Sequence, residues 1–385
     1  MISDLFPSLP DIAFAERDPA IIERELIGMY EKAYQLQYGK ERKLYPGDPI
    51  RLLLETIAFA LIIQRQLIDH TGKMNLLAYA KDDFLDHIGA LLGVYRLPAQ
   101  HALTTLRFTL SAPQNGVLII PAGTRATPGG GDIIFETLNV AEIPAGVTHI
   151  DISAQCTIAG GAGNGFALGQ INKIVDPFPW HMGVENITLS SGGGDVENNE
   201  NLRERIQLAP EYFSVAGPDG AYIYWARTAH PGIIDVAVVG PPQIEPGRVE
   251  IYPLMQKGEI PTQDILDLVH KTCNADDIRP LTDHVSVLPP VATQYDLDVK
   301  FWINRSRATQ EALIQKAVVQ AIEDWKTWQK SKLGRDLNPS ELNRRMINAG
   351  AKRTEIISPE FKVLERAELS VINTQVITLG GLEDD

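Results

Sequence analysis

The chain has 385 residues, of which 44% are hydrophobic and 22% are charged, and its formal net charge is −14. This composition is that of a soluble globular protein, and the length suggests roughly two to four domains. The acidic balance argues against a nucleic-acid-binding protein, which would carry a basic face. Two cysteines, Cys156 and Cys273, are too few for a disulfide framework and favour synthesis in a reducing cytoplasm.

The N-terminal sequence indicates neither a secretion signal nor a membrane span. The first residues, MISDLFPSLPDIAF, have no charged leading region and no long apolar core. The most apolar run in the chain is Ile57–Ile63, and its seven residues are far fewer than the about 20 that cross a bilayer. We therefore expect no direct insertion into a membrane.

Two start signals in the first 50 residues predict two long helices after an extended N-terminal arm. Asp18-Pro19 and Asp48-Pro49 each place a capping Asp before a Pro, whose missing N–H costs nothing in a first helical turn. The first signal begins a helix with one apolar stripe, and the second begins a helix of about 22 residues. The stripe comprises Ile22, Leu26, Met29, Ala33 and Leu36.

We expect two further helices in this region. One follows Gly72, and the other covers Asp82–Leu92, where Gly93 supplies the C-cap and Pro98 prevents continuation. Residues 1–97 are thus expected to form an N-terminal helical domain.

The centre of the second helix predicts an interaction surface. Its residues Ile57–Ile63 leave no polar face for two turns, so this helix needs neighbours on every side. The few helices of so small a domain cover such a surface only partly, and the uncovered strip would be typical of an assembly interface. We assign Ile57, Phe59 and Ile62 to that interface. The alternative is that the following β module packs on the strip within one chain.

After residue 97 the pattern changes from helical periodicity to short alternating runs between turn residues. Residues 98–192 are rich in Gly, Thr, Val and Ile and hold few basic residues. This pattern is typical of an antiparallel β module. The expected strands are Thr104–Leu110, Val117–Ile120, Ile133–Thr137, Thr148–Ala154 and Asn186–Leu189.

Two loops of the β module raise the question of a binding site. The run Gly160–Gly165 departs from the dinucleotide-binding pattern and no Lys-Ser/Thr follows it, so it is interpreted as a tight loop rather than a phosphate cradle. The aromatic loop Pro177–Met182 either stacks on a sugar or a partner or caps the β module.

A glycine run, Gly192–Gly194, opens the third predicted region. It frees the backbone before a helix for which Asn198 is the N-cap. A second helix is expected over Ala221–Thr228, and the alternating apolar residues of Ile234–Val239 predict a strand after it.

The C-terminal half predicts two β-α-β units in tandem. The expected order is strand Gly247–Tyr252, helix Thr262–Thr272, strand His284–Leu288, strand Tyr295–Ile303, helices Gln310–Lys330 and Pro339–Ala349, and strand Arg353–Ile357. Four side chains of the first unit's helix are expected to point inward: Ile265, Leu266, Leu268 and Val269. The acidic tail Leu379–Asp385 is expected to be disordered.

Together these patterns predict a multidomain α+β fold with an N-terminal helical bundle, a central antiparallel β module and C-terminal tandem β-α-β units. The predicted domains are residues 1–97, 98–192, 193–290 and 291–385.

Catalytic and metal-binding patterns are missing from the sequence. Neither H-E-x-x-H nor G-x-S-x-G occurs, and His87 has no second histidine four residues away. The other histidines are isolated as well, so the residues indicate no catalytic, metal or cofactor-binding site. Two alternatives to a structural protein stay open. The β region suggests a carbohydrate- or receptor-binding module, and distant segments would have to assemble the site of a hydrolase.

Several short motifs lie between residues 45 and 360. The glycine run begins one that continues with R-x-R, Y-x-x-W-A and a P-G strand, and the others include L-D-x-[IL]-[AG], P-A-G-T and R-P-x-T. These motifs resemble those of the baseplate J-like family, the wedge proteins of contractile phage tails and related injection machines. The matching positions include Leu85, Asp86, Gly93, Arg96, Pro121, Gly123, Thr124, Gly193, Gly194, Glu197, Arg203, Arg205, Gly217, Tyr222, Trp225, Ala226, Pro231, Arg279 and Pro280. Two residues depart from the pattern, because Asn198 and Pro218 stand where the family has Ser.

This resemblance implies a structural component of a baseplate wedge, which links the hub, the other wedge proteins and the sheath during assembly and contraction. The implied partners are other wedge proteins, further copies of the chain, and the sheath and hub proteins of the tail, with no nucleic acid. The resemblance implies no enzymatic activity and no cofactor. Such a protein is made in the bacterial cytoplasm and incorporated into a virion or a tail-like particle.

Overall fold

The computed structural model describes residues 9–129, 132–176, 178, 182–212, 218–275 and 278–384. These residues form two compact units. The first comprises the described chain up to Arg96 together with Asn198–Gln207, and the second comprises Leu97–Glu197 and the chain from Leu208 onward. The first unit is helical, and the second contains the β-sheets. The mixed α+β class is therefore confirmed, whereas the four domain boundaries stay predictions.

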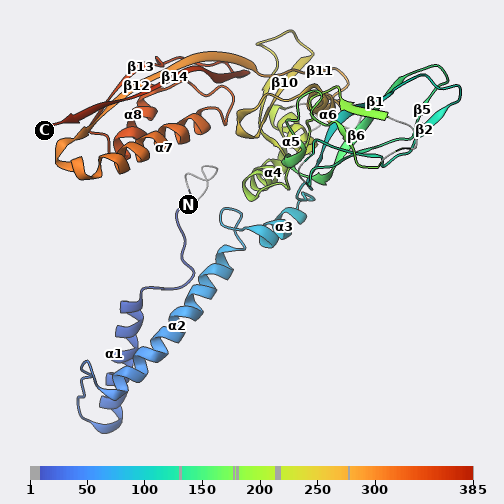
Figure 1. Ribbon diagram of the computed structural model, residues 1–385. Helices are drawn as coiled ribbons and strands as arrows, with labels where there is room; N and C mark the ends of the chain where they lie inside the picture. The colour runs from blue at the N-terminus through green and yellow to red at the C-terminus, as the bar shows by residue number, and fades with distance from the viewer. Residues whose placement is uncertain are drawn as a thin grey trace. The chain divides into compact units, whose positions relative to one another are not determined.

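A helical hairpin of α1 (Pro19–Tyr38) and α2 (Pro49–Lys73) forms most of the first unit (Figure 1). Both helices begin as predicted, because Asp18 and Asp48 each accept a hydrogen bond from the amide two residues later. The N-terminal arm is fastened to α2 by Asp69, which is 3% exposed and accepts a hydrogen bond from the Phe14 amide at 2.9 Å.

The third predicted helix, after Gly72, is wrong. Helix α2 continues to Lys73, and residues 74–81 form successive turns whose hydrogen bonds mostly join residues three apart. Two backbone carbonyls of this segment bind the side chain of Arg203 and are therefore engaged outside any helical ladder. A distant side chain thus stabilises these turns.

The last helix of this region, α3 (Asp82–Ala90), forms as predicted. Gly93 follows it with a φ of +70°, the left-handed conformation that commonly ends a helix. The Val94 amide then donates to the carbonyl of Gly89 at 2.9 Å, which closes the turn.

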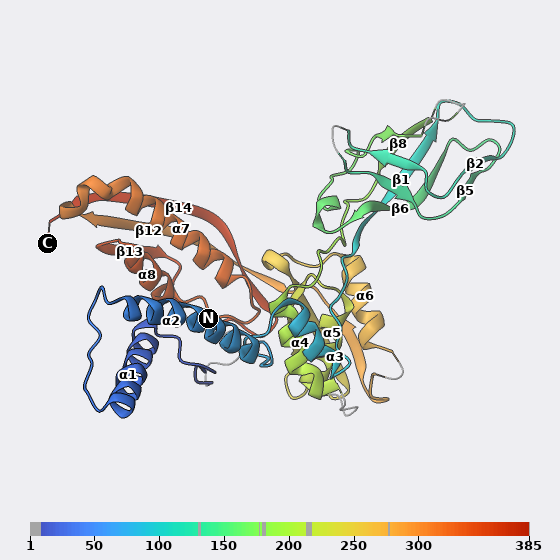
Figure 2. The same cartoon turned by 90° about the horizontal axis from the view of Figure 1, so that it is seen from below.

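The β module contains a six-stranded antiparallel sheet and a two-stranded ribbon, so the antiparallel prediction is confirmed (Figure 2). The sheet has the strand order β7-β3-β4-β6-β1-β8, and its outer strands β7 and β8 approach each other, so that it is nearly closed into a barrel. The strands are β1 (His101–Leu110), β2 (Leu118–Ile120), β3 (Arg125–Thr127), β4 (Phe135–Thr137), β5 (Ala141–Ile143), β6 (His149–Ala159), β7 (Lys173–Ile174) and β8 (Met182–Asn186). Buried apolar side chains, including Leu106, Phe108 and Phe135, fill its interior.

The strand predicted over Asn186–Leu189 is displaced, because β8 ends at Asn186. The buried side chain of this residue bonds backbone groups of the surrounding turns, donating to the carbonyl of Thr188 at 2.8 Å and accepting from the amide of Ile171 at 2.8 Å. Beyond β8 the amide of Thr105 donates to the Thr188 hydroxyl at 2.8 Å rather than to a backbone carbonyl, so the regular ladder ends there.

The central part of the second unit is a three-stranded sheet, β11-β10-β9, with helices packed on it. Its elements are α5 (Asp219–Ala229), β9 (Ile233–Val239), β10 (Arg248–Met255), α6 (Gln263–Cys273) and β11 (His284–Val287), and the preceding helix α4 (Asn199–Tyr212) begins in the first unit. Strands β10 and β11 are parallel and joined through α6, so the first β-α-β unit is confirmed. The inward assignment is wrong for Leu268, which is 38% exposed.

The C-terminal part is a sheet of order β13-β12-β14 with both of its helices on one face (Figure 1). Its elements are β12 (Val291–Asn304), α7 (Glu311–Gln329), α8 (Pro339–Asn348), β13 (Arg353–Ser358) and β14 (Glu368–Glu383). The second predicted β-α-β unit is wrong, because β13 runs antiparallel to β12. The parallel neighbour of β12 is β14.

Strand β14 was not predicted, and the expected disorder of Leu379–Asp385 is wrong for the described residues. The strand pairs with β12 along most of its length, for example Leu379 with Phe301. Its apolar residues complete a core that includes Trp325 of α7. A strand whose paired strand lies about 75 residues away in sequence has no local signal, since the energy that orders it comes from that pairing.

Candidate functional site: a motif junction and an exposed helical hairpin

Arg203 joins helix α4 to the turns that precede α3. Its side chain is 2% exposed, although a charged group is almost never buried without partners. Nε donates to the carbonyl of Leu77 at 2.8 Å, and Nη2 donates to the carbonyl of Ala80 at 2.6 Å. Nη1 pairs with Glu200 at 2.7 Å. The planar guanidinium therefore ties helix α4 to one backbone segment that lies more than 120 residues away in sequence.

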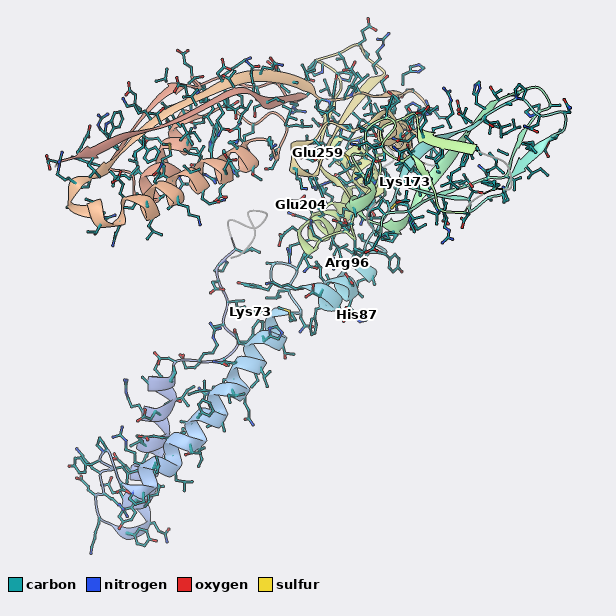
Figure 3. All side chains as sticks on the ribbon, viewed as in Figure 1. Lys73, His87, Arg96, Lys173, Glu204 and Glu259 are labelled. Carbon is teal, nitrogen blue, oxygen red and sulfur yellow. The ribbon has the colours of Figure 1, made fainter. Side chains whose placement is uncertain are left out.

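A second polar network joins the same helix to α3. Arg96 pairs with Asp86 at 2.6 Å and donates to Oδ1 of Asn199 at 2.8 Å. Asn199 also donates to Asp82 at 2.9 Å, and Asp82 has the unusual φ of +49°. Figure 3 labels Arg96, which lies next to α3. The two family motifs of the first unit thus meet in space, which the sequence order alone does not show.

Apolar packing supports this contact between α3 and α4. Leu85 is fully buried, and Ile206 of α4 is 2% exposed. A Cβ on Gly89 would stand 2.5 Å from the carbonyl of Val94 and 3.1 Å from the Ile206 side chain. Glycine is required there because the helix turn and its neighbour approach too closely for any side chain.

Two further motif residues bind main-chain groups that follow α3. Arg205 is 3% exposed and donates to the carbonyl of Tyr95 at 3.1 Å. Glu197 is 2% exposed, and its carboxylate accepts from the amide of Leu97 at 3.0 Å. The amide of Glu197 also donates to the carbonyl of Leu97 at 3.1 Å. Both charged side chains therefore act on the backbone.

The glycine run occupies a place where side chains do not fit. A Cβ on Gly193 would stand 2.4 Å from the carbonyl of Gly160, and a Cβ on Gly194 would stand 2.7 Å from the ring of His230. The Asn164 side chain bonds both backbone groups of Gly193 at 2.8 Å, as a neighbouring strand would. The sequence did not single out Asn164 or His230 as functional, although Asn164 lies in the run Gly160–Gly165 and His230 directly precedes the P-G match.

Replacement of Gly193 by alanine is expected to destabilise the second unit by about 1–3 kcal/mol, because the new methyl group meets a backbone carbonyl. The matched control is Gly116→Ala in the same barrel, where a Cβ has no neighbour within 4 Å. Urea unfolding of both variants, followed by circular dichroism, measures the difference. Equal midpoints for the two variants would contradict this prediction.

The P-A-G-T motif forms a tight turn at the rim of the barrel. Thr124 donates to the carbonyl of Pro121 at 2.8 Å, and Gly123 has a φ of +79°. Thr137 of β4 donates to the same carbonyl at 2.9 Å. These bonds give the motif a structural role in turning the chain.

The remaining motif residues shape the central sheet. The Tyr222 hydroxyl donates to the carboxylate of Asp283 at 2.8 Å, and Arg279 donates to the backbone carbonyl of the same residue at 2.6 Å. Burial raises the pKa of Tyr222 well above its usual range. Pro280 accepts the amide of Asp283 within this turn.

Helix α5 carries two other matched positions, and two more flank it. Ala226 is fully buried, whereas Trp225 is half-buried and contacts Tyr224 edge to face. Pro231 follows the helix in a turn before β9, and Gly217 lies outside the described residues.

The described residues do not gather into a reactive centre. They hold no cluster of three or more His, Cys, Asp or Glu side chains that would bind a metal ion. His87 is exposed, and both cysteines are buried. Burial raises the pKa of the Cys273 thiol to about 12, which disfavours the nucleophilic thiolate. Among these residues there is also no helix long and apolar enough to cross a membrane.

The helical hairpin exposes an unusual amount of apolar surface. Of the apolar stripe on α1, Ile22 is buried, whereas Met29 and Leu36 are 65% and 80% exposed. Phe59 of the assigned interface is 67% exposed, Ile57 is exposed and Ile62 is half-buried. We define the hairpin surface by its exposed apolar residues, which are Met29, Leu36, Leu52, Leu53, Ile57, Phe59, Ile63, Leu67 and Ile68.

The contact between α1 and α2 uses the polar face of α2. Arg51 binds Glu23 of α1 at 2.8 Å, and Arg65 lies 3.9 Å from Glu25 of α1. In an ordinary two-helix core the apolar residues would face each other and the charges would face water. Here ion pairs join the two helices, Ile22 and Ala58 are buried, and the apolar residues of the hairpin surface stay exposed.

Four family models match the chain in succession. They are the Baseplate J-like N-terminal domain at residues 47–102, the Baseplate J-like protein barrel domain at 105–193, the Baseplate J-like central domain at 214–289 and the Baseplate J-like protein C-terminal domain at 295–378. The matches reproduce the order helical region, barrel, central sheet and C-terminal sheet.

Known relatives are similar over part of their length. Baseplate protein J of Escherichia phage P2 is 29% identical over 203 residues, which is 52% of this chain and 65% of that protein. Baseplate protein gp47 of Escherichia phage Mu is 30% identical over 168 residues, which is 43% of this chain and 42% of that protein. The Mu-like prophage FluMu protein gp47 of Haemophilus influenzae is 27% identical over 169 residues, which is 43% of this chain and 44% of that protein.

A solved structure is also similar. A chain in the cryo-EM structure of the anti-feeding prophage baseplate, 6-fold symmetrised, has 11% sequence identity and a TM-score of 0.49, and the match covers 94% of this chain and 100% of that chain.

Proposed function

Because the chain belongs to the baseplate J-like family, we propose that it is a structural wedge component of the baseplate of a contractile tail or injection machine. It links the hub, the other wedge proteins and the sheath during assembly and contraction. Its partners are other wedge proteins, further copies of itself, and sheath and hub proteins. It is made in the bacterial cytoplasm, is incorporated into the virion or tail-like particle, and has no enzymatic activity.

The hairpin surface is the observation that carries this proposal. Isolated apolar residues on a surface are normal, but a contiguous apolar area of several hundred Å² is typical of an interaction site. Burial of about 400 Å² at about 25 cal/mol per Å² contributes on the order of 10 kcal/mol before the cost of association. In an assembled baseplate, such a surface would be buried against a neighbouring subunit.

The buried motif junction supports a mechanical role. Arg203, Arg205 and Glu197 bind backbone groups rather than solvent or a cavity, and they fix chain segments that are distant in sequence. Charged hydrogen bonds to backbone groups are stronger than neutral ones and define a geometry. A subunit that transmits force between neighbours requires such fixed joints.

Deletion of the gene for this chain is expected to remove assembled contractile particles from the producing cells. The physical reason is that neighbouring subunits lose the surface on which they meet. Electron microscopy of lysates, with the gene restored from a plasmid as the control, measures the effect.

The same experiment separates the wedge role from the alternatives. Intact particles that no longer adsorb to cells would indicate a receptor-binding protein, and intact particles that adsorb but fail at a later step would indicate an enzyme. Either result would contradict the proposal.

A further inference from the structure

The barrel is connected to the central sheet through two adjacent chain segments. They pair with each other, since Gln100 donates to the carbonyl of Gly194 at 2.7 Å and Leu103 donates to the carbonyl of Ser191 at 2.7 Å. One of these segments contains the run Gly192–Gly194, and Gly192 has a φ of +80°. Gly192 has open space where a side chain would stand, so it changes its backbone angles at little steric cost and the connection bends most easily there.

His230, from the end of α5, reaches this glycine run from the central part. The residue is 2% exposed. Its Nε2 lies 3.2 Å from the carbonyl oxygen of Gly192, and its Nδ1 accepts a hydrogen bond from the amide of Gly232 at 3.0 Å. The imidazole thus bonds its own turn with one nitrogen and the barrel connection with the other.

These two partners determine the protonation state of the ring. A backbone amide only donates, so Nδ1 must be the acceptor and carry no proton. A carbonyl only accepts, so Nε2 carries the proton and donates to Gly192. Burial lowers the pKa of His230 below its ordinary 6.5, which favours the same neutral form.

The charged side chains that the structure describes near the joint do not bond the imidazole of His230. Asp195 of the connecting segment accepts from the amide of Gly161 at 3.0 Å, and Arg227 of α5 donates to the carbonyl of Ile234. Lys257 and Glu259, which follow β10, line the pocket beside the glycine run. Both described hydrogen-bond partners of the imidazole are backbone groups, so neither is a carboxylate that would stabilise its charged form.

We propose that the run Gly192–Gly194 is a hinge for the barrel and that His230 is an acid-sensitive latch on it. A second proton must bind at Nδ1, where it faces the N–H of Gly232. Two donors then oppose each other in a buried site, so the ring leaves the joint for water. The carbonyl of Gly192 loses its partner, and the barrel is free to change orientation. This inference does not depend on the proposed function.

The direction of the pH dependence follows from linkage. Because the pKa of His230 is lower in the folded than in the unfolded chain, the unfolded chain binds the proton first as the pH falls. The stability that the latch contributes is complete above 6.5 and declines as the pH falls from 6.5 toward the folded value. The hinge is therefore closed at neutral pH and opens in acid.

The latch is tested by a distance measurement on the full chain. Spin labels are attached to cysteines introduced at Asn139 in the barrel and Lys271 on α6, both of which are exposed, while the native cysteines are buried. Pulsed electron paramagnetic resonance then gives the distance distribution at about pH 8 and about pH 5. At the acidic pH the distribution is expected to become about twofold broader, because a second orientation is populated.

Two substitutions identify the responsible group. In H230Q an amide replaces the imidazole with one donor and one acceptor but no titration, so the distribution should stay narrow at both pH values. In H230A both bonds are lost, so it should be broad at both. Any of three results would overturn the proposal. They are a distance distribution of the native chain that stays narrow in acid, a distribution of H230Q that broadens as that of the native chain does, and a distribution of H230A that is narrow. Circular dichroism of each sample establishes that the chain is folded.

Discussion

Replacement of Phe59 by aspartate is expected to abolish baseplate assembly while leaving the melting temperature of the isolated chain nearly unchanged. The side chain is 67% exposed, so the new carboxylate stays in water in the free chain and changes stability by only about 0.5 kcal/mol. In an assembled interface the same charge would be buried without a partner. A central interface residue that is lost in this way costs about 2–4 kcal/mol, or roughly 30- to 1,000-fold in affinity.

The measurements are thermal unfolding of the purified chain and particle yield in a complementation assay. Gln315→Asp is the matched control, because it places the same charge on an exposed position of α7 in the other unit. Ile62→Asp is a reference for a half-buried position and is expected to lower both stability and assembly. If Phe59→Asp gives insoluble protein with a lowered melting temperature, the hairpin surface is ordinary core, covered by the β module or another part of the same chain.

Replacement of Arg203 by alanine is expected to cost about 3 kcal/mol of stability in the first unit, because it breaks a buried charged network. The variant removes the hydrogen-bond donors to the carbonyls of Leu77 and Ala80. These two carbonyls are then left without their partner in a region that water reaches poorly. Glu200 also loses its ion pair. Hydrogen exchange resolved along the chain is the appropriate measurement, because a protein of two units does not unfold in one step.

Loss of protection is expected in α3, α4 and the turns between α2 and α3, with little change in the β-sheets. Arg203→Lys keeps the charge but not the planar guanidinium with its several donors, so its protection from hydrogen exchange should lie between those of the native chain and the alanine variant. The control Gln207→Ala removes an exposed side chain of the same helix and should have no effect beyond about 0.5 kcal/mol. Equal protection in Arg203→Ala and Gln207→Ala would contradict a structural role for the network.

The sequence by itself determined those elements that are stabilised by interactions between residues close together in sequence. The capping residues Asp18, Asp48 and Asn198 fix helix starts through hydrogen bonds within three residues, and the structure contains all three. Alternation of apolar and polar residues located β1, β2, β4 and β6 of the β module, because one face of each strand packs on the core, whereas the short strands β3, β5 and β7 were not predicted. The family motifs could be read for the same reason, since each is a short run with its own turn or cap.

Elements that are stabilised by residues far away in sequence became apparent only in the tertiary structure. Strand β14 does not belong to a hairpin and is stabilised by its pairing with β12. The turns of residues 74–81 are stabilised by Arg203, whose side chain donates hydrogen bonds to two of their carbonyls. The functional side chains follow the same division. The sequence by itself determined that the second helix is too apolar for its small domain, but burial and ion pairing decided which face is uncovered, because Arg51 and Arg65 direct the polar side of α2 toward α1. Likewise, His230 reads as an isolated histidine in the sequence, and only folding brings its imidazole to the carbonyl of Gly192.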